Sequence, residues 1–330
     1  MQVLLQQDAR LYSTFRLPAL LSRVYLLSSV AELRQQHWEE PPLVLGEGSN
    51  SIFLTDIQQP VLRYTADTIT VTTSADLVQL HVEAGHNWHQ LVVYCVEQGW
   101  WGLENLALIP GSAGAAPVQN IGAYGVELSD SCMYVDFFHW QSKSIQRLSN
   151  AQCRFGYRDS IFKQQLAGAG VIVAIGLQLS TKGQAKLSYR GLDHLPEDCV
   201  VADVFQAVIA VRRSKLPDPA ELANCGSFFK NPLLSPEAFR LLQQQFPQIP
   251  AYPQADGQFK TAAAWLIEQA GFKGKRLGDI GCYDKQPLVL VNYGAGNTAE
   301  LLQWVATIVS EVRARFGITL EPEVRMLDGR

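Results

Sequence analysis

The sequence predicts an α+β protein built from two units, and three observations support this prediction. Short apolar runs that alternate like strands fill the N-terminal part, interrupted by a helical pattern over residues 87–99. A second helical pattern, over 199–215, ends at LPDP, whose prolines cannot continue a helix. Beyond this point helices and strands alternate again. The 330 residues are enough for two or three domains of ordinary size.

The N-terminal elements are justified by alternation and by turn residues. LVLGEGSNSIFL predicts a strand, a glycine loop and a second strand, and ITVTTSADLVQLHVEAG alternates like a pair of strands. The helix that follows has Asn87 as its N-cap and ends at Gly99. MYVDFFHWQSKSIQRLS then predicts a strand pair, and AGVIVAIGLQLS predicts a buried strand.

The C-terminal elements begin after a domain boundary that we place near Lys215. Helical patterns cover SPEAFRLLQQQF and TAAAWLIEQA, and Gly271 stops the second one. QPLVLVNYG predicts a strand, a long helix runs from Asn297 to about Phe316, and TLEPEVRML returns to a strand.

Composition excludes several classes of protein. The net charge is −4 and the 27 Lys and Arg residues are dispersed, so nucleic acid is not expected as a partner. No stretch approaches the ~20 apolar residues of a membrane helix, and the polar, acidic N-terminus lacks the features of a secretory signal. We therefore expect a soluble cytoplasmic protein with no membrane partner. The six dispersed cysteines predict reduced, buried thiols rather than disulfides or a CxxC metal site.

Two glycine-rich loops are the first candidates for a binding site. They are GEGSN at 46–50 and IPGSAGAAPVQNIGAYG at 109–125, both poor in side-chain bulk. Successive main-chain amides in such loops form concavities that suit a diphosphate, although loops of this kind are often only tight turns. Neither loop fits GxGxxG between a strand and a helix, or GxxxxGK[ST]. The usual dinucleotide and P-loop signatures are therefore excluded.

A histidine cluster offers an alternative that we do not favour. His81, His86 and His89 are close in the sequence, but no acidic or cysteine partner is spaced to complete a metal site. We expect no metal. Covalent attachment of a cofactor through Cys225 or a histidine is a further alternative.

Six motifs in order carry a resemblance to a known family. GEGSN, IPGSAGAAPVQNIGAYG, FGYRDSIFK, GSFFKNP, AAWLIEQAG and LEPEVRML resemble the UDP-N-acetylenolpyruvoylglucosamine reductases, the MurB family, over essentially the whole chain. Ala113 departs from the larger aliphatic residue expected there. The resemblance implies an FAD-binding domain of the vanillyl-alcohol-oxidase (PCMH) type and a smaller α+β substrate-binding domain. It divides the chain into FAD subdomains at 1–65 and 66–215, a substrate domain at 216–318 and a returning strand at 319–330.

The resemblance also implies a reaction and three catalytic residues. NADPH reduces noncovalently bound FAD, which then reduces an enolpyruvyl ether on a UDP-sugar to give UDP-N-acetylmuramate, a peptidoglycan precursor. Arg158 matches the arginine near the substrate carboxylate, Ser227 the proton donor, and Glu323, rather than Glu321, the third catalytic residue. The residues expected to bind the cofactor are Gly46, Glu47, Gly48, Ser49, Asn50, Ser51, Pro110, Gly111, Ser112, Gly114, Ala115, Asn120, Ile121, Gly122, Ala123, Tyr124 and Gly125.

Substrate binding is assigned by the same resemblance. A diphosphate calls for cations and hydroxyls, and the matching positions are Tyr189, Lys215, Asn231, Tyr252 and Gln286. Arg213, close to Lys215, is expected to add charge to the same site. Tyr189 and Tyr252 resemble the form of the family that has a tyrosine substrate loop. We expect a monomer. The alternatives are another flavin oxidase or dehydrogenase of the same fold that acts on a sugar or alcohol, and a nucleotide-binding protein without catalysis.

Overall fold

The structure, a computed structural model, describes residues 1–189, 191–254 and 256–329 and contains two compact units. The first unit consists of Met1–Gln7, Leu21–Gly48 and Ile57–Arg213, and the second of Asp8–Leu20, Ser49–Asp56 and Ser214–Arg330. Each unit is described by itself. The domain limits predicted from the sequence, at residues 65, 215 and 318, stay predictions. Contacts between residues place one boundary between the two units at Arg213 and Ser214.

The first unit holds a four-stranded sheet of order β1-β2-β5-β3, in which β5 runs parallel to both neighbours. Its strands are β1 Gln2–Asp8, β2 Leu20–Leu27, β5 Val61–Tyr64 and β3 Leu43–Val44. Helix α1, Val30–Gln35, follows β2 and begins where the Ser29 hydroxyl accepts a hydrogen bond from the Glu32 N–H. The first glycine loop begins directly after β3.

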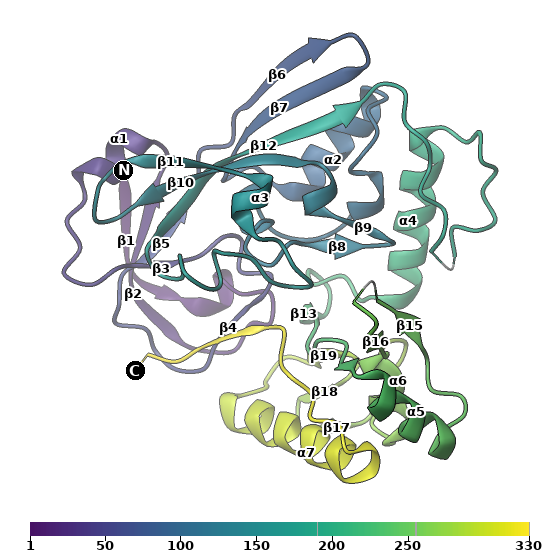
Figure 1. Ribbon diagram of the computed structural model, residues 1–330. Coiled ribbons are helices and arrows are strands. Elements are labelled where there is room, and N and C mark those ends of the chain that lie inside the picture. Colours follow the sequence, from purple (N-terminus) through teal and green to yellow (C-terminus); the bar gives the residue numbers. More distant parts are fainter. Residues whose placement is uncertain (190, 255, 330) are drawn as a thin grey trace. The chain divides into compact units, whose positions relative to one another are not determined.

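A five-stranded antiparallel sheet of order β11-β10-β12-β7-β6 forms the rest of the first unit's framework. Its strands are β6 Ile69–Ser74, β7 Leu77–Glu83, β10 Cys132–His139, β11 Ile145–Ser149 and β12 Gly170–Ser180. Figure 1 shows β6 and β7 as a long hairpin that continues into α2, Trp88–Glu97. Trp88, Leu91 and Val92 of this helix are buried in the same core as β7 and β12, so α2 is anchored beside the second glycine loop.

Short elements complete the first unit around that loop. They are the 3-10 turns η2 Glu104–Leu106, η3 Ala113–Ala115 and η4 Leu128–Asp130, the strands β8 Gly122–Ala123 and β9 Val126–Glu127, and the helices α3 Asn150–Cys153 and α4 Val201–Lys215. Between β8 and β9 the turn residues Tyr124 and Gly125 have φ of 52° and 80°. Two consecutive positive φ values identify a type I′ hairpin turn.

The second unit is built on a sheet of order β13-β19-β18-β17, with a smaller sheet β14-β16-β15. The strands are β13 Ala223–Ser227, β14 Leu233–Leu234, β15 Tyr252–Pro253, β16 Phe259–Lys260, β17 Arg276–Leu277, β18 Ile280–Cys282 and β19 Val289–Asn292. The helices are α5 Pro236–Gln245, α6 Ala263–Gln269 and α7 Thr298–Phe316, and a 3-10 turn, η1, covers Ala9–Leu11.

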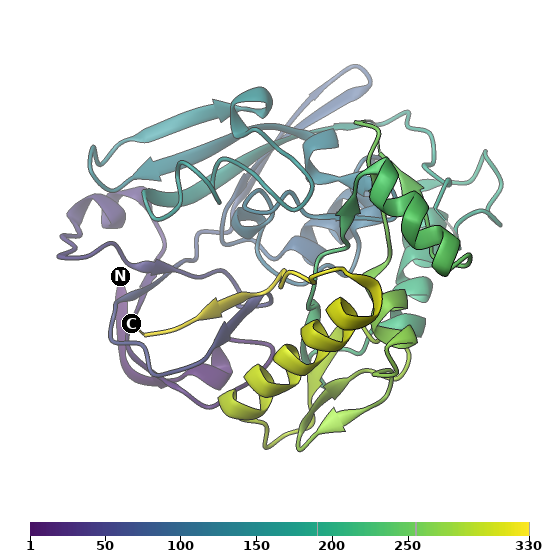
Figure 2. The same ribbon diagram turned by 60° about the horizontal axis from the view of Figure 1, so that its bottom comes forward.

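The end of the chain returns to an early segment of the second unit. Figure 2 shows the yellow chain leaving α7 and forming β20, Arg325–Leu327. This strand pairs in parallel with β4, Ser51–Phe53, so Arg325 lies beside Ser51. The first glycine loop, residues 46–50, is therefore followed directly in the chain by a strand that pairs with the C-terminal segment.

The helices predicted after Asn87, Ser235 and Asn297 are confirmed, because each of these side chains caps the first turn. The strand pair after the second glycine loop, the buried strand before α4 and the C-terminal strand are confirmed as well. No helix in the described ranges is long and apolar enough to cross a membrane.

Candidate active site

The two glycine loops contact each other within the first unit. A Cβ on Gly46 would lie 2.8 Å from the Oγ of Ser112 and 3.3 Å from the Cβ of Ala115. Gly114 approaches the end of β7 just as closely, since its Cβ would lie 2.5 Å from the Cβ of Ala84. Glycine is required at both positions because any side chain would overlap its neighbours.

Main-chain donors without an acceptor collect where the loops meet. The N–H groups of Gly46, Glu47, Gly48, Gly111 and Ser112 donate no hydrogen bond to any residue that the structure describes. Gly48, Gly111 and Ser112 are buried. Buried amides are nearly always paired in native proteins, so an external acceptor is expected here. A diphosphate supplies such acceptors, and the residues therefore fit the diphosphate of FAD.

Other residues predicted to bind the cofactor have internal roles. Asn120 is fully buried, and its amide donates to Glu127 at 2.7 Å and to the Gly156 carbonyl at 3.2 Å. Gly125 serves the type I′ turn. Glu47 accepts from the Asn87 amide at 2.8 Å and so joins the first loop to the start of α2. Ile121 is buried, Ala115 is partly buried, and Pro110 is exposed.

Arg158 lies beside the β8–β9 hairpin. It sits in a tight turn closed by hydrogen bonds between Gly156 and Asp159, with a φ of 55° that is uncommon for a residue with a side chain. Its guanidinium donates to the Gly122 carbonyl at 2.9 Å. Strained conformations of this kind persist where surrounding contacts impose them, and the catalytic role of Arg158 stays a prediction.

Ser227 and Glu323 are brought together within the second unit. Ser227 ends β13 after Gly226, whose φ of 68° accompanies an irregularity in the pairing with β19. The Glu323 N–H donates to the Phe228 carbonyl at 2.8 Å, next to Ser227 in the chain. Ser227 is partly exposed, and its hydroxyl makes no hydrogen bond to any described residue. The hydroxyl is therefore available to a ligand.

The end of the first glycine motif belongs to the same part of the second unit. The Asn50 amide donates to the Glu323 carbonyl at 3.3 Å, and the Arg325 N–H donates to the Asn50 carbonyl at 2.9 Å. The Ser51 carbonyl accepts from the Ser13 hydroxyl at 2.5 Å, and Ser49 accepts from Thr14 at 3.4 Å. Residues 49–51 and 323–325 thus form one hydrogen-bonded set.

One cation that sequence reasoning passed over lies at the centre of an aromatic group. Arg212 of α4 hydrogen-bonds Tyr124, and the ring of Tyr124 packs edge-on against that of Tyr189 with centroids 4.8 Å apart. Arg212 also donates to the Leu108 carbonyl at 3.2 Å. The adjacent Arg213, which we expect to add charge to the substrate site, is exposed. The two arginines have different surroundings because neighbours in a helix point about 100° apart.

The remaining residues predicted to bind substrate are accessible. Lys215 and Tyr252 are exposed, and Gln286 is partly exposed. Asn231 uses its side-chain oxygen to accept from the Ala263 N–H at 3.0 Å, where α6 begins without a cap of its own. Its amide nitrogen remains for a ligand. The structure therefore assigns Asn231 a second, structural task.

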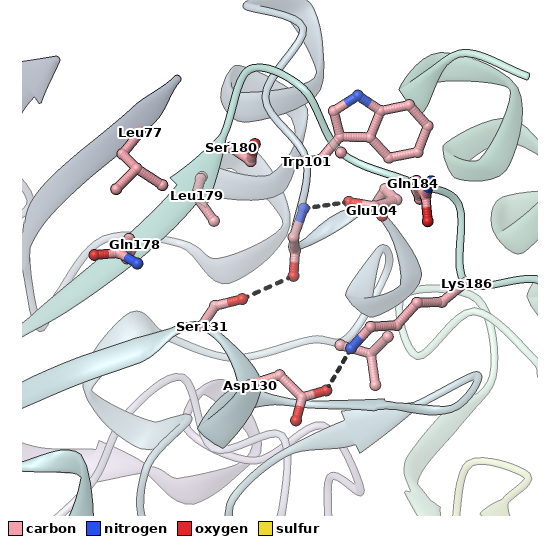
Figure 3. A pocket seen from close by; sticks show the side chains of 13 residues that line it. Leu77, Trp101, Glu104, Asp130, Ser131, Gln178, Leu179, Ser180, Gln184 and Lys186 are labelled. Atoms are coloured by element: carbon pink, nitrogen blue, oxygen red, sulfur yellow. Dashed lines mark hydrogen bonds and ion pairs between the residues drawn. The ribbon is translucent and has the colours of Figure 1, made fainter. Parts of the chain in front are cut away.

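A separate cavity of about 250 Å³ lies between Trp101 and Lys186 of the first unit (Figure 3). None of the residues predicted to be catalytic lines it. Its most buried charged group is Glu104, 4% exposed, which accepts from the Gly102 N–H at 2.7 Å. Burial raises the pKa of Glu104, and Lys186 only partly offsets this. Lys186 itself pairs with Asp130 at 3.0 Å.

Neither the thiols nor the imidazoles of the described residues gather into a metal site. All six cysteines are free and buried, as expected, and burial raises the pKa of Cys225 to about 12. No group of three or more His, Cys, Asp and Glu side chains in the described ranges is arranged to hold a metal. His81 instead contacts the Tyr134 hydroxyl at 2.9 Å, and His86 contacts the Asp67 carbonyl at 2.7 Å.

The fold and the paired loops define a class, namely a flavoprotein with an FAD-binding domain. Residues 29–146 match a family model described as an FAD binding domain. Residues 218–327 match the model for the C-terminal domain of UDP-N-acetylenolpyruvoylglucosamine reductase.

Full-length relatives give the family. The chain is 47% identical over 98% of its length to the UDP-N-acetylenolpyruvoylglucosamine reductase of Pasteurella multocida, covering 96% of that protein. It is 43% identical to that of Vibrio cholerae, over 99% of this chain and 95% of the relative. The chain belongs to the UDP-N-acetylenolpyruvoylglucosamine reductase family. The crystal structure of the Thermus caldophilus reductase matches 98% of both chains with a TM-score of 0.70 and 22% identity, which confirms the fold.

Proposed function

We propose that the chain reduces the enolpyruvyl ether of UDP-N-acetyl-3-O-(1-carboxyvinyl)-glucosamine to UDP-N-acetylmuramate, using NADPH and noncovalent FAD. The observation that carries this proposal is the unbonded Ser227 hydroxyl one residue from the backbone contact between Phe228 and Glu323. Full-length similarity to reductases of this name supports the substrate. The same similarity argues against an oxidase of the same fold.

The cofactor is bound by the main chain of the glycine loops. The donors of Gly46, Glu47, Gly48, Gly111 and Ser112 would receive the FAD diphosphate, since they have no acceptor among the described residues. Held by these donors, FAD would supply the hydride chemistry that links NADPH to the methylene carbon of the substrate. No cysteine thiol is exposed for covalent attachment of FAD, because Cys225 and the other five cysteines are buried.

Arg158 would bind the carboxylate next to the reacting double bond. Hydride addition places negative charge on this conjugated group, and a guanidinium stabilises it through two parallel donors. The turn between Gly156 and Asp159 fixes the backbone, and the bond to the Gly122 carbonyl orients the guanidinium. Both features would lower the entropy lost on binding.

Ser227 would deliver the proton that completes the reaction. A serine hydroxyl is a weak acid, so it can donate only to a strongly basic carbon such as the enolate formed after hydride addition. Glu323 would orient the substrate or share the proton, because its backbone lies beside that of Phe228. Hydrogen bonds from Asn50 to Glu323 and from Arg325 to Asn50 hold this segment in place.

The UDP diphosphate calls for cations and hydroxyls near the sugar. Tyr189, Arg213, Lys215, Asn231, Tyr252 and Gln286 are proposed for this role, and their exposure supports it. Within the first unit, Arg212 would act by holding Tyr124, which packs on Tyr189. NADPH and a UDP-sugar are cytosolic metabolites, so we place the enzyme in the cytoplasm. We also propose that it acts as a monomer.

A stepwise flavin titration tests the proposal. Purified protein should be yellow, lose the flavin absorbance when NADPH is added without oxygen, and regain it when the enolpyruvyl UDP-sugar is added. Ser227→Ala should still be bleached by NADPH, whereas its reoxidation by substrate should slow by at least about a thousandfold. Ser310→Ala, at an exposed position of α7, is the matched control.

Three outcomes would contradict the proposal. A colourless protein that takes up no FAD would refute the flavin site. Reoxidation by air that is unaffected by the UDP-sugar would indicate an oxidase. Normal turnover of the Ser227→Ala protein would show that Ser227 is not the proton donor, although the proposed reduction of FAD would still stand.

A further inference from the structure

The start of the second glycine loop is held in an unusual backbone conformation. Leu108, directly before Ile109, has a φ of 55°. This left-handed region is sterically costly for a bulky residue, and such a conformation persists only when surrounding contacts impose it. The reason for the conformation must therefore lie in the groups that contact the Leu108 peptide.

Both polar groups of Leu108 are bound by side chains. Its N–H donates to the Nδ1 of His89 at 3.1 Å, and its carbonyl accepts from Arg212 at 3.2 Å. His89 comes from α2 and Arg212 from α4, two elements that belong to the same unit. We call these three residues the Leu108 clamp.

The clamp adds to bonds that α2 makes along the same segment. The Trp88 indole donates to the Leu106 carbonyl at 3.0 Å, and the Trp88 N–H donates to the Gly111 carbonyl at 2.9 Å. The Ala113 N–H donates to the His86 carbonyl at 2.8 Å. Residues 106, 108, 111 and 113 are therefore held by α2 or by His86 just before it. Among these contacts, the one with His89 is made by an ionisable side chain.

We propose that His89 and Arg212 are positioning residues for FAD, which hold the Leu108 peptide so that the free N–H groups of Gly111 and Ser112 face the diphosphate. This inference rests on the FAD site proposed above. It makes a specific demand on His89, since Nδ1 can accept the bond from Leu108 only while it carries no proton. Protonation would replace the acceptor by a donor and leave the Leu108 N–H unpaired.

The surroundings of His89 keep it neutral. Its ring stacks on Phe205 with centroids 6.0 Å apart, and the charged groups that act on it are Arg212 and Arg213, both on α4. The segment 106–113 contributes no ionisable side chain. Burial and the two arginines lower the pKa of His89 from its ordinary value of 6.5. The clamp is thus intact at neutral pH and is lost as pH falls below 6.5 through the lowered value.

The dissociation constant of FAD, measured by quenching of flavin fluorescence, tests the clamp. From about pH 8 to about pH 5 the wild-type constant should rise about tenfold, because fewer molecules hold Leu108 in the competent conformation. His89→Asn places an amide oxygen close to the position of Nδ1 and does not titrate. Its affinity should stay near the neutral wild-type value and change less than about twofold over the same range.

Two further variants separate positioning from simple packing. His89→Leu lacks the acceptor, so its FAD affinity should be about tenfold weaker than that of wild type at about pH 8 and should not fall further as the pH is lowered. Arg212→Met removes a positive charge beside His89, so binding should be weaker overall and should begin to fall at a higher pH than in wild type. His139→Asn is the control, because His139 contacts Gln146 on β11 and no part of the glycine loops.

Circular dichroism at each pH confirms that the proteins remain folded. The inference would be overturned if the wild-type dissociation constant of FAD did not change between about pH 8 and about pH 5, or if His89→Asn showed the same pH dependence of this constant as wild type. Either result would leave the FAD site itself intact. A wild-type protein that binds no FAD at any pH would overturn both. Loss of the pH dependence in His139→Asn would also contradict the role of His89.

Discussion

The two compact units differ in the part of the chain that carries the candidate chemistry. In the first unit it is the main chain: free N–H groups in glycine loops, with Leu108 and Arg158 at left-handed φ. In the second unit it is the side chains of Ser227, at the end of β13, and Glu323, two residues before β20. The candidate site of the first unit thus depends on backbone conformation, whereas that of the second unit depends on the functional groups of two side chains.

This difference affects how each site responds to mutation. A main-chain site depends on space, so it is sensitive to added atoms at glycine and tolerant of changes in polarity. A side-chain site depends on the identity of a few groups, so it is sensitive to substitutions that preserve shape but change protonation. An added methyl at a glycine of the first unit and a change of protonation at a side chain of the second unit therefore test this difference.

After Ser227→Ala, the largest effect is expected from Glu323→Gln in the second unit. Glutamine preserves the shape of the side chain but cannot share a proton, so substrate-dependent reoxidation of the reduced flavin should slow about a hundredfold. Reduction by NADPH should be unchanged. Rapid mixing in a stopped-flow spectrometer measures the two half-reactions separately.

Glu321→Gln provides the matched control two positions earlier. Glu321 is 73% exposed and pairs with Lys230 at 3.3 Å, and exposed pairs of this kind contribute little. Its reoxidation rate should stay within about twofold of wild type. If Glu321→Gln were the slow variant, the assignment of Glu323 would be wrong.

A smaller effect is expected from Gly114→Ala in the first unit. The added methyl would lie 2.5 Å from the Cβ of Ala84, and relief of this overlap must shift the loop. Overpacking of this kind costs about 1–3 kcal/mol, so the FAD dissociation constant should rise about twentyfold. Equilibrium dialysis against FAD measures it.

Gly168→Ala is the control for the loop variant. Gly168 has a φ of 73° and nothing within 4 Å of an added Cβ, so this change should reduce stability by about 1 kcal/mol without altering FAD affinity. Equal losses of affinity in both variants would show that stability, and not the space around the loop, determines binding.

The sequence predicted what local chemistry determines. Asn87, Ser235 and Asn297 cap helices because their side chains bond the first turn, and this requires no knowledge of distant residues. The sheet formed by β1, β2, β5 and β3 was missed, since its parallel pairs join segments far apart in the chain.

The candidate site could be predicted only in part, for related reasons. Glycine content indicates an anion site, but it does not show that Asn120 and Gly125 serve the hairpin. Nothing local distinguishes Arg212 from Arg213, because only the packing of α4 decides which one reaches Tyr124 and Leu108. Ser227 and Glu323 were found by resemblance alone, as composition carries no signal for a single hydroxyl or carboxylate.

The smallest effect should separate buried charge from loop conformation within the first unit. Burial raises the pKa of Glu104, so its charged form opposes folding at neutral pH (Figure 3). Glu104→Gln keeps an oxygen to accept from Gly102 and should raise the melting temperature by about 2 °C at about pH 8.

The sign follows from linkage. Because the pKa of Glu104 is raised in the folded protein, its favourable contribution to the free energy of unfolding is fully present below the ordinary pKa of 4.5. This contribution is lost as the pH rises through the pKa of the folded state. The advantage of glutamine should therefore vanish when melting is measured below pH 4.5. FAD affinity should not change, because the Gly111 and Ser112 amides are main-chain donors. A Glu104→Gln protein that melts higher but binds FAD more weakly would show that side-chain charge contributes to a site we assign to the main chain.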